Sequence, residues 1–472
     1  MMPAKYIKEI TQEIIIKIFG MLFILSVFCG PSAADEFELA DIEPVWTWSY
    51  HLARLAAVPG GERGLEPGFL EFDYTKPREG SRLRRDLYDG WVVGEGGGCV
   101  LETGYRIPVG SHFVTRLRIR ASAHGTDPDR VRVLEGGLWG ATGPLAWSLG
   151  RQRFFWSSTP ETSLLLSNNA APFDALSLGS RRDWGLPLNL GGLRWQLLLA
   201  YLDDEHRVIP FPLLWGMRGS WNPAPQFSLE LKRTVLFGGA GRTERLTPGD
   251  LLNLFLARGE NLPEGERGPA DSDQKLSYAL RWRWPLPHFA RIYAHQWGLQ
   301  DLEISYEYGG EDALRRGFPT ATGRLIGIRT RIRGWDISGT YAETVDDANR
   351  WYEHVVYESG YRYKGWVMSH PPGGDGRWVR VRFGRPWLAM QGFSIEGTWE
   401  RGGVEDKPSW EVFRLNLRWW ISPIPGLRLQ AEGEMATLKT GSTATLQPRY
   451  PEPALRLSLI VGGTVQMGNG TN

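Results

Sequence analysis

Asp203, Asp204, Glu205 and His206 form a dense group of acid and base side chains. Two carboxylates can hydrolyse a glycosidic bond, but a solvated acidic loop has the same composition. The sequence lacks a Gly-x-Ser-x-Gly elbow, a zinc-binding helix motif and a phosphate-binding loop. We therefore interpret the group as a loop, and we expect no enzyme activity, no metal and no cofactor.

Other side chains have the chemistry of saccharide recognition. Arg242 and Arg377 could bind the carboxylates of acidic sugars bidentately, or could form salt bridges within a loop or lumen. Trp351 and Tyr361 could stack on sugar rings, as could Tyr352, Tyr363 and Trp366. The alternative for these aromatic residues is anchoring at a membrane interface or packing within a loop.

Asn168 and Asn169 could bind sugar hydroxyls, although turn formation explains them equally well. Asp375, placed between two glycines, could bind a cation or could simply form a turn. The candidate ligand-binding residues are therefore Arg242, Trp351, Tyr361, Asp375, Arg377, Asn168 and Asn169.

Alternating hydropathy predicts the elements that hold these residues. In residues 275–284, Leu276, Tyr278 and Leu280 alternate with polar or charged neighbours. The pattern recurs in residues 301–308, 392–401, 411–420 and 427–437. A period of two indicates β-strands with one apolar and one polar face. Such strands fit either a soluble sandwich or an outer-membrane barrel with a charged lumen.

Aromatic residues at strand ends, and connections that alternate between short and long, favour the barrel. We place 18 strands, at 87–94, 99–107, 112–124, 130–140, 145–154, 174–183, 193–202, 213–221, 226–237, 275–284, 301–308, 324–333, 335–345, 377–385, 392–401, 411–420, 427–437 and 453–463. The prediction is an all-β, antiparallel up-and-down barrel with both termini in the periplasm. Residues 285–300, which include His288 and His295, have helical spacing and predict a short interfacial helix.

The N-terminus predicts export. Lysines 5, 8 and 17 precede the apolar residues 18–28, and Ser32-Ala33-Ala34 offers a cleavage site. We expect a signal peptide at 1–34, an N-terminal periplasmic segment at 35–86, the barrel at 87–465 and a tail at 466–472. The expected location is the outer membrane of a Gram-negative bacterium. The balanced charge, 54 Lys and Arg against 53 Asp and Glu, argues against binding to nucleic acid.

Three motifs resemble the Wzi family of capsule assembly proteins. They are Gly150–Trp156 with Ser163–Phe173, Gly238–Arg242, and Tyr357–Tyr361 leading to Gly373–Gly376. The resemblance spans roughly residues 100–465. It implies an outer-membrane, lectin-like barrel that binds capsular or exported polysaccharide, with export machinery as a further partner. A porin-like channel for small solutes or saccharides is the alternative.

Two features depart from the family pattern. Family members often have Trp-Gly-Pro-Gly where this chain has Trp156-Ser157-Ser158-Thr159, so the tight glycine turn is lost. Many members also have a helical periplasmic region before the barrel. Residues 35–86 contain many Gly, Pro and Arg residues and show no sustained helical period.

Overall fold

The computed structural model describes most of the chain between residues 64 and 461. The described residues are 64–75, 96–109, 112–123, 130–159, 161–242, 246–256, 268, 271–284, 299–311, 321–344, 351–388, 391–402, 409–424, 427–441, 447–448 and 452–461. The expected signal peptide, the expected tail and the expected helix up to residue 298 lie outside these residues.

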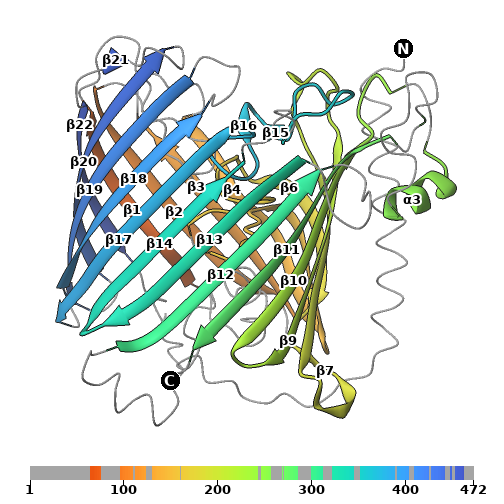
Figure 1. Cartoon of the computed structure of the whole chain (residues 1–472), viewed down its shortest axis with the longest axis horizontal. Helices are drawn as coiled ribbons and strands as arrows, with labels where there is room; N and C mark the ends of the chain where they lie inside the picture. Colours follow the sequence, from red (N-terminus) through yellow and green to blue (C-terminus); the bar gives the residue numbers. More distant parts are fainter. Residues whose placement is uncertain are drawn as a thin grey trace, which may run out of the picture.

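The strands form one closed antiparallel barrel (Figure 1). The sheet has 20 strands within the described residues, of which β7 (Trp184–Gly185) and β21 (Gln447–Pro448) are two-residue additions. The other 18 form a ring in chain order, and β1 (Gly64–Thr75) closes it by pairing with β22 (Glu452–Val461). The predicted antiparallel up-and-down barrel is confirmed.

The remaining ring strands are β2 Gly96–Val109, β3 Phe113–Ser122, β4 Val131–Thr142, β5 Leu145–Gln152, β6 Phe173–Ser180, β8 Gly192–Tyr201, β9 Leu213–Ala224, β10 Phe227–Phe237, β11 Asp273–Trp284, β12 Leu299–Glu311, β13 Ala321–Ile332, β14 Trp335–Glu343, β17 Gly376–Leu388, β18 Gln391–Gly402, β19 Ser409–Ile424 and β20 Leu427–Gly441. The connections contain η2 (Pro187–Asn189), α3 (Pro248–Phe255), β15 (Arg362–Tyr363) and β16 (Trp366–Val367). No helix among the described residues is long and apolar enough to cross a membrane.

The first strand of the ring lies before the first predicted strand. We expected it at 87–94, which lies outside the described residues, whereas the structure forms it at 64–75. The boundary at residue 87 is therefore corrected, because the barrel begins inside the segment predicted to be periplasmic. The strand's pairing with β2 shifts register between Glu66 and Phe69. Pro67 and Gly68 lie in that shift and interrupt the alternation that would have revealed the strand.

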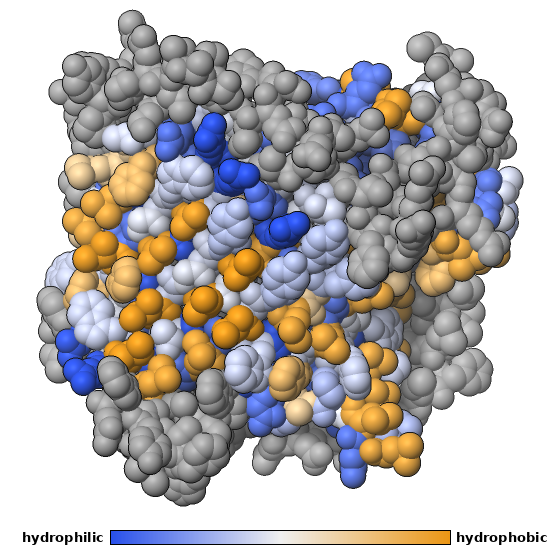
Figure 2. All heavy atoms as spheres, in the orientation of Figure 1, coloured by the Kyte–Doolittle hydropathy of each residue, from blue (hydrophilic) through white to orange (hydrophobic). Residues whose placement is uncertain are grey.

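The two faces of the wall differ as the alternation predicted. On β11, Lys275 and Ser277 are buried toward the lumen, whereas Tyr278 and Leu280 are 40% and 39% exposed on the outside. Apolar side chains spread over the outer wall in Figure 2. The exposed apolar side chains around the wall include Leu117, Leu197, Leu231, Tyr306, Ile328, Phe383, Ile395, Phe413, Leu417 and Met435.

The two ends of the barrel carry different connections. Adjacent strands β9–β10, β13–β14, β17–β18 and β19–β20 are joined by two residues each at one end, which is lower in Figure 1. The connections from β5 to β6, β10 to β11 and β14 to β17 emerge at the opposite end, called here the long-loop end. The alternation of short and long connections is therefore confirmed for these joints.

Candidate functional site

Two long connections fold back into the lumen at the long-loop end. They are residues 153–159 and 161–172 between β5 and β6, and residues 351–375 between β14 and β17. We call them together the plug. Their side chains share one buried cluster with lumen-facing residues of the wall. The cluster includes Phe154, Trp156, Leu164, Leu166, Trp351, Tyr352, Tyr357, Tyr361, Tyr363, Trp366 and Met368 from the plug, and Leu198, Leu214, Leu236, Leu325 and Trp378 from strands.

Hydrogen bonds join the two halves of the plug. The Ser167 backbone N–H donates to Met368 O at 2.8 Å, and the Ser167 hydroxyl donates to Ser369 O at 2.6 Å. The Tyr352 hydroxyl donates to Leu164 O at 2.6 Å. Because these polar groups are buried, breaking one bond would leave an unpaired partner at a cost of about 1–3 kcal/mol. The two loops are therefore expected to hold their positions together.

Side chains replace the missing glycine turn at residues 156–159. The Thr159 N–H donates to the Ser157 hydroxyl at 2.9 Å, so the turn is closed by a serine rather than by glycine conformations. A Cβ atom at Gly327 of β13 would lie 2.5 Å from Thr159 Cγ2. Gly327 is therefore needed for the close approach of this turn to the wall.

A buried ionic network lies beneath the plug. Lys232 Nζ is 2.9 Å from Glu307 Oε2 and donates to Trp156 O at 3.1 Å. Glu307 also accepts from the Ser158 backbone N–H and hydroxyl at 3.3 and 3.2 Å. Arg218 pairs with Glu230 at 2.8 Å in the same part of the lumen. Charged side chains of the wall, which pair with one another, thus hold the plug by charge-assisted hydrogen bonds.

The aromatic candidates do not form a sugar-binding surface. Trp351 and Tyr361 are fully buried within the plug. The Tyr361 hydroxyl donates to Thr234 Oγ1 at 3.0 Å, Lys275 Nζ lies 4.7 Å from its ring centroid, and burial raises the pKa of the phenol. Tyr352, Tyr363 and Trp366 are buried in the same cluster. Of the two interpretations of these residues, packing within the loop agrees with the structure and stacking on sugars does not, because the hydrophobic effect favours packing large rings inside the lumen.

The two asparagines lie in the same loop of the plug. Asn169 is buried and its amide donates to Val367 O at 2.9 Å, so it is a structural residue rather than an exposed contact. Asn168 is half-buried, and its Oδ1 accepts no hydrogen bond. Neither amide presents the full set of donors and acceptors that binding to sugar hydroxyls would use.

Asp375 is also buried, at 6% exposure, and neither carboxylate oxygen has a hydrogen-bond partner. His370, five residues earlier in the chain, is also buried. Its Nδ1 lies within hydrogen-bonding distance of Thr162 Oγ1, at 3.1 Å, and its ring contacts Trp378 edge-on. Burial lowers the pKa of His370 to about 3, so the ring is neutral. Within the described ranges, no three His, Cys, Asp or Glu side chains come together as metal ligands.

The two candidate arginines lie on different faces. Arg242 donates to Gly268 O and Asp271 O, at 2.9 and 3.2 Å, and its guanidinium lies 6.0 Å from the Tyr357 ring centroid. Arg377 pairs with Glu343 at 2.9 Å, and both residues lie at outward-facing positions of their strands. Arg242 is thus held by a connection and Arg377 by the outer wall, so the two arginines do not form one binding surface. The salt-bridge alternative holds for Arg377.

The acidic group at 203–206 is a loop, as we interpreted it. Asp204 accepts from the His206 N–H at 3.2 Å and from the Lys364 N–H at 2.7 Å, which ties the β8–β9 connection to the plug. Asp203, Glu205 and His206 are exposed. Since Asp204 is buried and Asp203 is exposed, the two carboxylates do not face a common substrate position.

The sequence reasoning missed the exposed tip of the plug. Lys364 and Gly365 form the turn of a small hairpin between β15 and β16, with positive φ values of 49° and 80°. Lys364 is exposed and its Nζ lies 5.5 Å from the Tyr363 ring centroid. A two-residue turn ending in glycine between Tyr363 and Trp366 was the available signal. This hairpin places a cation on the surface of the plug.

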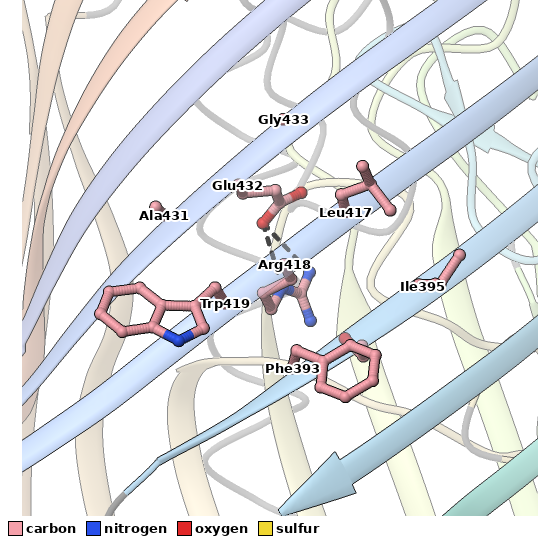
Figure 3. A pocket seen from close by; sticks show the side chains of 9 residues that line it. Phe393, Ile395, Leu417, Arg418, Trp419, Ala431, Glu432 and Gly433 are labelled. Atoms are coloured by element: carbon pink, nitrogen blue, oxygen red, sulfur yellow. Dashed lines mark hydrogen bonds and ion pairs between the residues drawn. The ribbon is translucent and has the colours of Figure 1, made fainter.

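A hollow of about 320 Å³ lies elsewhere, on the outer wall between β18, β19 and β20 (Figure 3). Phe393, Leu417 and Trp419 surround the small residues Ala431 and Gly433. The Arg418–Glu432 ion pair forms its floor, with the two groups 3.1 Å apart. The apolar rim identifies the hollow as part of the wall's outer surface, and it shares no residue with the plug.

Solved structures with this architecture are barrels of the outer membrane. The Wzi protein of group 1 capsule assembly in Escherichia coli, described as a carbohydrate-binding β-barrel, aligns with a TM-score of 0.64 at 14% identity, over 86% of this chain and 85% of that one. OpdO of Pseudomonas aeruginosa aligns with a TM-score of 0.50 at 12% identity, over 86% and 98%. At these identities the likeness establishes the fold alone.

Sequence comparison identifies the family of the chain. No curated protein matches the chain closely enough to serve as a relative. The profile of the capsule assembly protein Wzi family, in contrast, matches residues 78–393, which is more than half of the chain. The match includes both halves of the plug and all three motifs that predicted the resemblance. The chain belongs to the capsule assembly protein Wzi family of outer-membrane β-barrels.

Proposed function

We propose that this protein binds capsular or exported polysaccharide at the cell surface and does not act on it as an enzyme. The family match and the carbohydrate-binding description of the Escherichia coli barrel support the proposal. The observation that carries it is the plug, because a buried aromatic cluster occupies the lumen at the long-loop end. A polymer would therefore meet a closed, shallow surface rather than a pore.

Two cations at the long-loop end are the proposed contacts. Lys364 stands at the tip of the plug, and Arg242 lies half-buried beside the plug residue Tyr357. Both are suited to the carboxylates of an acidic polysaccharide. Each contact would be weak, and many copies binding one long chain would supply retention through avidity.

Retention of polysaccharide by intact cells tests the proposal. Cells that carry R242A/K364A should release polymer into the medium, while total synthesis and the amount of folded barrel stay at the wild-type level. R181Q/R182Q, at the short connection between β6 and β7, is the matched control for two lost charges. Wild-type retention by the double Ala variant, at normal barrel levels, would contradict the proposed contacts.

Conductance tests the channel alternative. The wild-type protein should show no steady current in a planar bilayer, because the plug and its buried cluster lie in the lumen at the long-loop end. A variant in which residues 157–168 are replaced by a short Gly-Ser linker should conduct, since it loses Leu164 and Leu166 of the buried cluster and the hydrogen bonds of Leu164 and Ser167 with residues 351–375. Large steady currents from the wild-type protein would favour the porin-like function.

A further inference from the structure

A row of charged side chains crosses the outer wall near the long-loop end. It contains Glu411, Arg401, Arg377, Glu343 and Arg324, and each is the direct cross-strand partner of the next, from β19 through β18, β17 and β14 to β13. Each lies within three residues of the long-loop end of its strand. We call this set the charged row.

The charged row faces outward. Trp378 and Glu400, the neighbours of Arg377 and Arg401 inside the described wall, are buried toward the lumen. Since successive side chains of a strand point to opposite faces, the two arginines point away from the lumen. Phe383 and Ile395 share their parity and are exposed on the outer wall.

An apolar and aromatic row lies immediately below. Moving two residues toward the short-connection end, the cross-strand partners are Ile326, Tyr341, Val379, Trp399 and Phe413. Figure 2 shows the change from hydrophilic side chains near the strand ends to apolar ones lower on the wall. In an outer-membrane barrel this step marks the level where headgroups meet acyl chains.

Two arginines in the charged row are directly opposed. Arg377 pairs in register with Arg401, and directly opposed Cβ atoms lie about 4.5–5.5 Å apart. Like charges at such positions repel one another. Glu343 lies 2.9 Å from Arg377 Nε, and Glu411 accepts from Trp399 Nε1 at 2.7 Å. Arg401 Nε is buried and has no hydrogen-bond partner.

We propose that Arg377 and Arg401 bind a phosphate group of a phosphorylated glycolipid in the outer leaflet of the membrane. A phosphate between the two guanidinium groups would relieve their repulsion and accept hydrogen bonds from both of them. Both side chains project at the headgroup level, where the glycolipid's phosphates lie. The proposal concerns the outer wall and is independent of polysaccharide binding by the plug.

Lipid binding by the purified barrel tests this assignment. The protein in detergent micelles is titrated with bisphosphorylated lipid A and, separately, with the same lipid after dephosphorylation, and bound lipid is counted by native mass spectrometry. The wild-type protein should retain the phosphorylated lipid and bind the dephosphorylated one at least about tenfold more weakly, the size of a lost charge-assisted bond.

R377Q/R401Q should show the same loss, whereas R181Q/R182Q, which removes two charges at the opposite end, should bind normally. Heat-modifiable gel migration verifies that each variant is folded. If R377Q/R401Q does not fold, R401K serves in its place, and it should bind more weakly because lysine cannot bind phosphate bidentately. Equal binding of both lipids, or wild-type affinity in a folded R377Q/R401Q or R401K variant, would overturn the proposal.

Discussion

Lys232 of β10 and Glu307 of β12 form a buried ion pair of 2.9 Å, although β11 lies between their strands. The pair spans the lumen face of β11, where the Ser277 hydroxyl donates to Glu307 at 2.9 Å. Through Trp156 O and Ser158, the same two residues also bind the plug. The pair therefore connects the wall to the plug.

Replacing Lys232 with methionine should destabilise the barrel by about 3–5 kcal/mol, because Glu307 then keeps a buried charge without its partner. Equilibrium urea unfolding of the purified protein measures the loss. The exposed K364M is the matched control and should change stability by less than about 0.5 kcal/mol. K232M/E307Q should lose less than the sum of the single variants. Additive losses would show that Lys232 and Glu307 do not stabilise one another.

The plug should loosen at acidic pH. The pKa of His370 is about 3 in the folded protein, below the ordinary value near 6.5. The imidazole therefore binds a proton more tightly when the plug opens, and protonation stabilises the open form. The contribution of His370 to stability should be constant above about pH 6.5 and should fall as the pH drops toward 3. Limited proteolysis of the folded barrel across this range measures the opening. H370Q, which keeps a polar group for Thr162, should remove most of the pH dependence, and an unchanged profile would assign the effect to other groups.

Arg233 should control the local stability of α3. Its guanidinium donates to Phe255 O and Leu254 O at 2.6 and 2.7 Å, at the C-terminal end of the helix. R233A should therefore speed hydrogen exchange in residues 248–256, because the last carbonyls lose a charged donor. T247A removes the hydroxyl of the capping box and should give a smaller increase at the opposite end. Unchanged exchange in R233A would mean that packing of Leu254 alone holds the helix.

The two ends of the barrel should be accessible from different sides of the membrane. An epitope inserted between Lys364 and Gly365 lies in the exposed hairpin of the plug and should bind antibody on whole cells. The same epitope at Gly334, in the two-residue turn between β13 and β14, should be labelled only after permeabilisation. The reverse pattern would invert the topology and remove the basis for surface binding.

Alternating hydropathy was enough to predict most of the wall. It succeeded because each strand contacts a polar lumen on one side and an apolar surface on the other, as Ser277 and Tyr278 of β11 illustrate. It failed at β1, where Pro67 and Gly68 interrupt the period. All the other predicted strands overlap strands of the structure.

The site was harder to predict because exposure depends on how long loops fold. Trp351 and Tyr361 belong to a long connection, and the sequence left open whether they stack on sugars or pack within the loop. The structure instead packs them against wall residues far away in sequence, such as Thr234 and Leu325. A local pattern carries no signal for such contacts. The salt bridge of Arg377, in contrast, needs only the register between two neighbouring strands.

The pairing of β1 with β22 affects how the chain can be assembled. The first strand of the ring stays without one of its two neighbours until the last strand has been delivered, nearly 400 residues later. Until then the open edge of β1 exposes backbone donors and acceptors that the bilayer interior cannot satisfy. Loss of the final strand would thus leave β1 and β20 as free edges, open to pairing with other chains. Removing residues 452–461 should consequently yield aggregated chains rather than a smaller barrel.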